Sequence, residues 1–230
     1  MIDVLYTLGN GSVYQNQEIK TSVRLLKKHC KFNRIFIIGE NPNIEGTIHI
    51  PFKERLTRED NVFLKICEMC EKTDISENFL YMMDDVFIIK DIDIDNYPMY
   101  YSQEIPNYNK PTSYQLKIIE TKAFLLRNSK PFLHYGVHCP IVYNKSKIKE
   151  IDPLYWYYVN GKLSKCGLNP RILYGNWFEH KNIKQIDDLK LVKDYPMEEL
   201  KEMLKDKEWF SIGSRSYQGN IKRYLEELCV

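Results

Sequence analysis

The sequence has 230 residues, of which 43% are hydrophobic and 28% charged, and its net charge is +2. This is the composition of a soluble globular protein; a disordered chain would have fewer apolar residues and a larger net charge. With 10 glycines and 10 prolines it is not collagen-like, and no apolar run approaches the ~18 residues of a membrane span. The balance of 33 basic and 31 acidic residues argues against a protein that mainly coats nucleic acid, although a local basic patch remains compatible with it.

Short apolar runs alternate with amphipathic segments in the first 90 residues. Apolar residues at helical spacing predict helices over residues 16–30 and 59–72. Apolar runs that end in glycine or polar residues predict strands, at residues 2–6, 34–39, 46–52, 79–83 and 86–89. This order predicts an α/β fold with a mainly parallel sheet flanked by helices. The amino terminus has no basic region followed by a long apolar run, so we interpret it as the first strand rather than a signal peptide.

The pattern is looser after residue 90. A tyrosine-rich, proline-broken segment at residues 96–114 is longer than a tight connection, and loops of this length are more often functional. We expect a helix over residues 113–128, extended structure from 131 to a short helix near Lys145, and an aromatic turn region at 153–162. Residues 171–178 are expected to form a strand, and the tail to hold two amphipathic segments. No linker divides the chain, so we predict one domain spanning residues 1–230.

The cysteines have the pattern of core residues. Cys67 and Cys70 form a C-x-x-C but lack a second ligand pair at zinc spacing, and they alternate with apolar residues of a predicted helix. We therefore favour buried, reduced thiols over a metal or redox site, and reduced thiols imply a cytoplasmic protein. The full set is Cys30, Cys67, Cys70, Cys139, Cys166 and Cys229.

The strongest local signal is the segment NFLYMMDDVFIIKD, in which Asp84 and Asp85 interrupt an apolar run. Two adjacent ionised carboxylates are costly inside a buried strand, so we expect them where the strand leaves the sheet. The carboxyl ends of parallel strands are also where open α/β sheets bind ligands, and carboxylate oxygens suit Mg²⁺ or Mn²⁺. An acidic turn without a metal is the alternative.

This arrangement resembles the acidic motif of GT-A glycosyltransferases, and the chain is similar in particular to the Stealth group of sugar-phosphate transferases. The patches that carry the resemblance are IDVLYTLGNGS, TSVRLLKKHC, FLYMMDDVF and HCPIVYNKSKIKEI, in this order. The segment LTREDNVF keeps Leu56 and Asn61 of the family's pattern but not its proline and serine. That departure leaves the transferred group open between a sugar and a sugar phosphate.

The resemblance implies a GT-A-like fold with a nucleotide-sugar-binding half at residues 1–95 and an acceptor-side half at 96–230. It implies that Asp84 and Asp85 bind a divalent metal, Mn²⁺ or Mg²⁺, and the donor diphosphate, with His138 as a further metal ligand or catalytic group. Arg171 would face the donor phosphates, so the expected catalytic residues are Asp85, His138 and Arg171. His134 is a weaker candidate than His138. Donor-binding residues implied in the same way are Asp3, Thr7, Gly9, Asn10, Arg55, Arg58, Asn61 and Asp84.

The function expected from these residues is metal-dependent transfer of a sugar from a nucleotide sugar, with a UDP-sugar as the expected donor, to an acceptor hydroxyl. The acceptor stays open among a glycan, a lipid and a hydroxymethylated DNA base; the last would need a base turned out of the duplex and a basic surface. Sugar-1-phosphate transfer of the Stealth type is the alternative reaction. A globular interaction module, in which the acidic pair and the histidines are structural, is the alternative without catalysis.

Overall fold

The computed structural model describes residues 1–160 and 167–229 and has a central sheet of five strands in the order β3-β2-β1-β4-β7. Strand β1 (Asp3–Leu8) pairs in parallel with β2 (Ile35–Gly39) and β4 (Asn78–Met82), and β2 pairs in parallel with β3 (Ile48–Pro51). Strand β7 (Ile141–Asn144) runs antiparallel to β4 at the sheet edge. The predicted α/β class and mainly parallel sheet are therefore confirmed.

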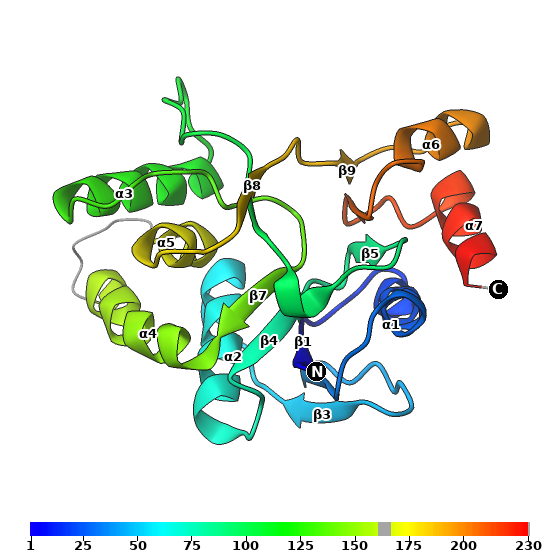
Figure 1. Cartoon of the computed structure of the whole chain (residues 1–230), viewed down its shortest axis with the longest axis horizontal. Helices are drawn as coiled ribbons and strands as arrows, with labels where there is room; N and C mark the ends of the chain where they lie inside the picture. The colour runs from blue at the N-terminus through cyan, green and yellow to red at the C-terminus, as the bar shows by residue number, and fades with distance from the viewer. Residues whose placement is uncertain (161–166, 230) are drawn as a thin grey trace.

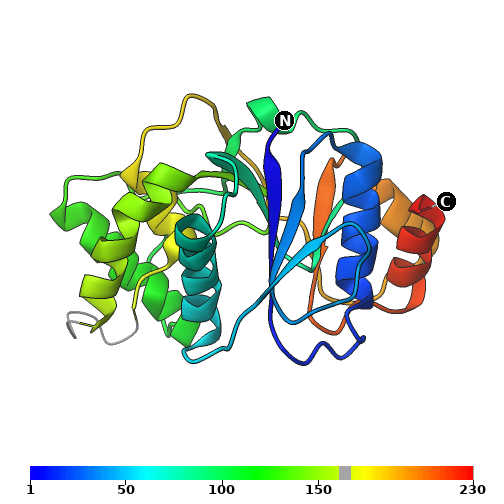
Figure 2. The same ribbon diagram turned by 90° about the horizontal axis from the view of Figure 1, so that it is seen from below.

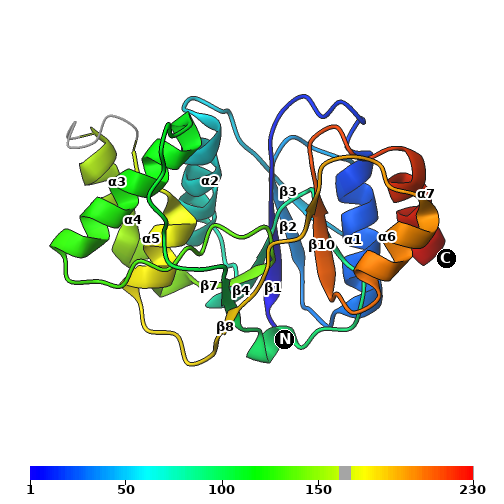
Figure 3. The same ribbon diagram turned by 90° about the horizontal axis from the view of Figure 1, so that it is seen from above.

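The central strands are buried on both faces, which explains their continuous apolar runs. In β1, Val4, Tyr6 and Leu8 point into one core and Leu5 into the other. Helix α1 (Gln17–His29) covers the first face, and α2 (Arg58–Lys72) covers the second. Figures 2 and 3 show the sheet between these two layers, with α1 on one side and α2 on the other.

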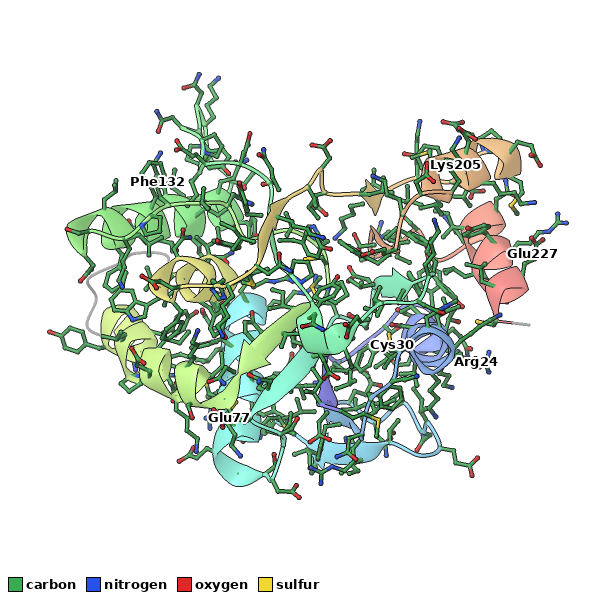
Figure 4. The ribbon with its side chains drawn as sticks, in the orientation of Figure 1. Arg24, Cys30, Glu77, Phe132, Lys205 and Glu227 are labelled. Atoms are coloured by element: carbon green, nitrogen blue, oxygen red, sulfur yellow. The ribbon has the colours of Figure 1, made fainter. Side chains whose placement is uncertain are left out.

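The second half of the chain completes both layers. On the α2 side lie α3 (Ser113–Arg127), α4 (Lys145–Asn160) and α5 (Pro170–Trp177) (Figure 1). On the α1 side lie α6 (Met197–Leu204) and α7 (Gly219–Leu228); Figure 4 shows the labelled side chain of Glu227 extending outward from α7. The amphipathic segments predicted in the tail are thus helices.

Two smaller sheets join segments that are distant in sequence. Strand β10 (Trp209–Ile212) lies between β5 (Val86–Ile88) and β9 (Lys190–Leu191), antiparallel to β5 and parallel to β9. Strand β6 (Met99–Tyr101), which follows the short helix η1 (Ile94–Asn96), pairs in parallel with β8 (Ile183–Gln185). The carboxyl-terminal part of the chain therefore pairs, through β10, with β5, the strand that directly follows the acidic pair.

The structure corrects two expectations about local structure. Of residues 171–178, expected as a strand, 171–177 belong to α5, because Asn169 Oδ1 caps the helix by accepting from the Ile172 amide at 3.1 Å and Pro170 occupies its first turn. The aromatic segment after Pro153 continues α4 to Asn160 rather than forming a turn, and its Tyr155 is fully buried in the core against α2. Cys67, Cys70 and Cys139 are buried free thiols as predicted, whereas Cys166 lies outside the described residues.

A buried ion pair fixes the amino end of β1. The Asp3 side chain is fully buried, and its Oδ2 accepts from Arg34 Nη2 and from the Ser76 amide, both at 2.8 Å. Its Oδ1 accepts from Asn33 Nδ2 at 2.9 Å. Burial opposes ionisation, but these donors outweigh it and hold the pKa of Asp3 below its usual value.

We predict that Asp3→Asn lowers the free energy of unfolding at pH 7 by about 3 kcal/mol, because it leaves the Arg34 charge without its buried partner. Since the pKa of Asp3 is depressed in the folded state, its contribution is present above the unfolded pKa of about 4 and is lost as the pH falls through the folded pKa. Urea unfolding at pH 7 and at acidic pH measures this difference.

Asp74→Asn is the matched control, because Asp74 pairs with the same guanidinium but its side chain is 80% exposed. Exposed pairs contribute little, so this variant should differ from the wild type by less than about 1 kcal/mol. The interpretation would be contradicted if both variants lost the same free energy of unfolding. It would also be contradicted if Asp3→Asn were as much less stable than the wild type at acidic pH as at pH 7.

Candidate functional site

Asp84 and Asp85 lie where β4 ends, in the turn that leads into β5. The Val86 amide donates to the Met83 carbonyl at 3.3 Å, and the Asp85 carbonyl accepts from the Ile212 amide at 3.0 Å. Because β1, β2 and β3 run parallel to β4, their carboxyl ends and the loops that follow them lie at the same edge of the sheet. The acidic pair thus has the position that the sequence predicts.

Cations of the protein offset the charge of the two carboxylates only in part. Burial and the neighbouring carboxylates of Asp85 and Glu18 raise the pKa of Asp84 to about 7, against a smaller effect of Arg58. Asp85 is 19% exposed; its Oδ2 lies 3.6 Å from Lys190 Nζ, while its Oδ1 is buried without a hydrogen-bond partner. The site therefore concentrates negative charge and keeps a carboxylate oxygen free.

A divalent cation fits these oxygens, because it would relieve the repulsion between the carboxylates and would take Asp85 Oδ1 as a ligand. Glu18 lies at the start of α1; its Oε1 accepts from Ser12 Oγ at 2.6 Å and its Oε2 is buried without a partner. Within residues 1–160 and 167–229 no three His, Cys, Asp or Glu side chains are arranged as a metal-binding group. His138 accordingly does not complete a ligand set with the acidic pair, and the protein would supply only part of the coordination shell.

The loop after β1 borders the same edge of the sheet. Gly9, Asn10 and Gly11 are exposed, and Gly11 has the left-handed φ of 84° that favours glycine. Its amide donates to Glu40 Oε2 at 3.2 Å. Thr7, inside the strand, is instead buried, with its Oγ1 3.0 Å from the Tyr81 hydroxyl. Exposed turn residues therefore lie at the edge of the sheet that carries the acidic pair.

A buried lysine holds the neighbouring loops in place. Lys65 on α2 is 1% exposed, and its Nζ donates to the Leu8 carbonyl and to Glu54 Oε1, both at 2.7 Å. Gly39, at the end of β2, allows the close approach: at its φ of 125° a Cβ would lie 1.9 Å from the Leu8 carbonyl oxygen. The ends of β1 and β2 and the loop after β3 are thus fixed relative to one another.

The arginines and the asparagine expected at the donor differ in their roles. Asn61 is buried and shapes the loop before α2, because its Oδ1 accepts from the Arg55 and Leu56 amides at 3.1 Å. Arg55 is exposed, with its Nη2 3.7 Å from Glu68 Oε1, whereas the charge of Arg58 acts on Asp84. Arg58 is therefore the better placed of the two cations for an anion bound at the acidic pair.

Arg171 contacts Met83, the residue that follows β4. Its Nη2 donates to the Cys139 carbonyl at 2.6 Å, its Nη1 lies 3.8 Å from Met83 Sδ, and its buried Nε has no partner. In the part of the chain that the structure describes, no carboxylate lies within ion-pair distance of this guanidinium. Arg171 thus has an unpartnered N–H donor near the end of β4, which suits binding of a phosphate group. The sequence predicts the same role for Arg171.

His138 is paired with a residue that the sequence analysis did not identify. Its Nδ1 lies 2.7 Å from Asp188 Oδ2, and its amide donates to Asp188 Oδ1 at 3.1 Å. Burial opposes ionisation of Asp188, but the bonds from His138 outweigh it and keep the pKa of Asp188 below its usual value. Asp188 precedes β9, which carries Lys190, so the segment before β10 reaches both His138 and Asp85. His134 is half-buried nearby, and burial lowers its pKa.

Asp188 and Lys190 were not identified as site residues from the sequence. A signal was present, since Asp187-Asp188 precedes Leu189 and β9 much as Asp84-Asp85 precedes β5. Asp3, in contrast, was expected near the nucleotide. Its parallel register with β4 places it opposite Phe79, at the amino end of the sheet, and its oxygens are engaged by Arg34, Asn33 and Ser76. We therefore remove Asp3 from the candidate site.

Solved glycosyltransferase structures share this fold. An active-site mutant of LgtC superposes with a TM-score of 0.54 at 10% identity, covering 99% of this chain and 95% of that one. The galactosyltransferase LgtC in complex with donor and acceptor sugar analogues gives a TM-score of 0.53 with the same identity and coverage. The chain thus has the GT-A-like fold predicted for it.

No family model and no curated protein matches the sequence. The likeness to the Stealth group therefore rests on the sequence patches alone. Over the described residues no helix is both long and apolar enough to cross a membrane.

We predict that Asp84→Asn stabilises the protein in the absence of divalent metal by roughly 2 kcal/mol at pH 8, because it removes a half-buried charge next to Asp85. Since the pKa of Asp84 is raised to about 7, the penalty is absent below the unfolded pKa, grows as the pH rises and is complete above pH 7. Thermal unfolding in a chelating buffer at pH 8 and pH 4 measures it.

Asp206→Asn is the control, because Asp206 is exposed and lies away from the sheet edge, after α6. It should leave the unfolding temperature nearly unchanged at both pH values. If Asp84→Asn is destabilising at pH 8, the carboxylate is stabilised by its surroundings and the electrostatic description is incorrect.

Proposed function

We propose that this protein is a metal-dependent glycosyltransferase that moves a sugar from a nucleotide sugar to an acceptor hydroxyl. The observation that carries the proposal is the half-buried Asp84-Asp85 pair, with an unpartnered Asp85 oxygen, at the carboxyl edge of a GT-A-like sheet. The fold similarity to LgtC, solved with donor and acceptor sugar analogues, supports the same reaction class.

In this proposal Asp84 and Asp85 hold Mn²⁺ or Mg²⁺ together with the donor diphosphate. The cation supplies electrostatic stabilisation of the charge that develops on the leaving diphosphate. The charge of Arg58 acts on Asp84, and Arg171 Nη1 lies 3.8 Å from Sδ of Met83, the residue before Asp84. Their guanidinium groups bind phosphate oxygens and hold the donor in one orientation.

The remaining donor contacts are assigned to the loops at the same edge. Gly9 and Asn10 offer exposed backbone groups to the nucleotide, and Lys65 and Asn61 hold the adjoining loops in position. We retain Thr7 as a positioning residue, because its contact with Tyr81 links the ends of β1 and β4.

His138 is assigned to the acceptor hydroxyl rather than to the metal. Asp188 Oδ2 lies 2.7 Å from Nδ1 of His138, so the tautomer that donates to Asp188 has Nε2 as its proton acceptor. A base oriented in this way takes the proton of the attacking hydroxyl as the new bond forms. The acceptor itself stays a proposal among a glycan, a lipid and modified DNA.

Mass spectrometry of products tests the reaction directly. The protein is incubated with Mn²⁺ or Mg²⁺, mixed nucleotide sugars and the three acceptor classes. A product heavier by one sugar, formed only with metal, supports the proposal. A product that carries sugar plus phosphate identifies the Stealth type of transfer instead. If no product forms and no donor binds in a metal-dependent way, the result favours an interaction module.

We expect Asp85→Asn to reduce kcat by at least about a hundredfold and to abolish the rise in unfolding temperature caused by Mn²⁺ plus the donor. The cause is the loss of the carboxylate that holds the cation. Asp206→Asn makes the same change at an exposed position and should keep the wild-type kcat and the rise in unfolding temperature. Full metal-dependent activity of Asp85→Asn would exclude the proposed metal site.

His138→Gln should lower kcat by a factor of about 10²–10⁴ while leaving the affinity for the donor nearly unchanged, since a general base acts on the acceptor. Asp188→Asn should cause a smaller loss of kcat, because it disturbs only the orientation and tautomer of the ring. Steady-state kinetics and donor titration by calorimetry separate the two effects. Loss of donor binding without loss of kcat would place His138 at the metal or the diphosphate.

A further inference from the structure

A buried ion pair joins α2 to α3, a helix from the second half of the chain. Asp60 on α2 and Lys117 on α3 are both buried, and Lys117 Nζ lies 3.1 Å from Asp60 Oδ1. Figures 2 and 3 show the two helices on the same side of the sheet. The desolvation of two buried charges offsets much of their attraction, so stability alone is a weak reason for such a pair.

Asp60 is the point at which three helices meet. Its Oδ1 also accepts from the Tyr155 hydroxyl of α4, and its Oδ2 accepts from Thr57 Oγ1 at 2.5 Å. Burial opposes ionisation, but the hydrogen bonds from Thr57 and Tyr155 and the charge of Lys117 outweigh it and hold the pKa of Asp60 below its usual value. Asp60 is thus an ionised carboxylate with both oxygens engaged, which fixes its orientation.

The lysine of this pair also holds the residues on both sides of Arg58. Lys117 Nζ donates to Thr57 Oγ1 at 3.2 Å and lies 3.5 Å from Glu59 Oε2. Thr57 precedes the first residue of α2, yet its side chain does not cap the helix. Its hydroxyl is bonded to Lys117 and Asp60 instead. The start of α2 is therefore fixed from α3.

The backbone that leads to Arg58 is fixed from within α2. Asn61 Oδ1 accepts from the Arg55 and Leu56 amides, and Asn61 Nδ2 donates to the Leu56 carbonyl at 2.7 Å. Arg58 itself is exposed, and its charge acts on Asp84. Among the described residues no carboxylate forms an ion pair with Arg58. Its guanidinium is thus carried by a rigid backbone and is free to bind an anion.

We propose that Lys117 is a positioning residue for the donor: through Thr57 and Asp60 it holds Arg58 in place at the acidic pair before the donor binds. This inference rests on the proposed function, in which Arg58 binds the donor diphosphate. An arginine on a backbone that is already fixed loses less conformational entropy when it binds phosphate, so the donor binds more tightly. Since Lys117 belongs to α3, donor affinity then depends on the second half of the chain.

Calorimetric titration of the full-length protein tests the proposal, with UDP, GDP, ADP and dTDP as probes, each in the presence of Mn²⁺. Thr57→Val removes the hydroxyl that joins Lys117 to the start of α2 and keeps the size of the side chain. We expect it to weaken binding of the nucleotide that the wild type binds best by about fivefold. Thr57→Ser keeps the hydroxyl and should bind that nucleotide within about twofold of the wild type.

A double-mutant cycle with Arg58→Gln separates positioning from a general structural effect. We expect Arg58→Gln to weaken binding about tenfold, because a ligand of the diphosphate is lost. If Thr57 acts through Arg58, Thr57→Val should change the affinity of the Arg58→Gln variant by less than about twofold. A hydroxyl that only stabilises the fold would weaken binding about equally in both backgrounds.

Lys117→Met tests the lysine itself and should show the same dependence on Arg58 as Thr57→Val. It leaves Asp60 without its cation, so the titration is done well below the unfolding temperature of this variant. Lys122→Met is the matched control on the same helix, because Lys122 Nζ donates to the Ile105 carbonyl at 2.7 Å and not to α2. This control should bind the nucleotide as the wild type does.

The inference is overturned if a nucleotide binds the wild type and Thr57→Val binds it equally well, or if Thr57→Val weakens binding to the same extent in the Arg58→Gln background. The proposed function fails separately, and the inference with it, if none of the four nucleotides binds the wild type in the presence of Mn²⁺.

Discussion

The structure depends on one electrostatic constraint, the presence of two adjacent carboxylates at the end of a buried strand. The sheet cannot place Asp84 and Asp85 inside β4, because β4 is covered on both faces, so they lie at the first turn beyond it. There another carboxylate, that of Glu18, acts on Asp84, and Lys190 Nζ lies 3.6 Å from Asp85 Oδ2. Such an arrangement favours a cation bound from outside the chain.

The rest of the fold keeps this edge of the sheet rigid. Lys65 ties the end of β1 to the loop after β3, and β10, from near the end of the chain, pairs with β5 directly after the acidic pair. The segment before β9 brings Asp188 to His138 and Lys190 to Asp85. Groups from distant parts of the sequence thus converge on one region, as a reaction with donor, metal and acceptor requires.

The sequence was sufficient for the elements whose signals are local. Continuous apolar runs and helical periodicity located the central strands, α1, α2 and α3, and the acidic pair identified the edge of the sheet. Helix α5 was predicted as a strand because its apolar and aromatic residues are typical of strands. The helix-start signals, the Asn169 cap and Pro170, were not recognised. The contacts of Asp188 with His138, of Lys190 with Asp85 and of Asp3 with Arg34 could not be predicted, because they depend on long-range pairing that no periodicity encodes.

The most direct measurement of the central claim is the anomalous scattering of Mn²⁺ in crystals grown with the cation and a nucleoside diphosphate. Our account predicts one strong peak in contact with Asp85 Oδ1 and the Asp84 carboxylate, with the diphosphate oxygens completing the coordination. A bound nucleotide whose phosphates lie away from β4, or a manganese ion held by other residues, would contradict it.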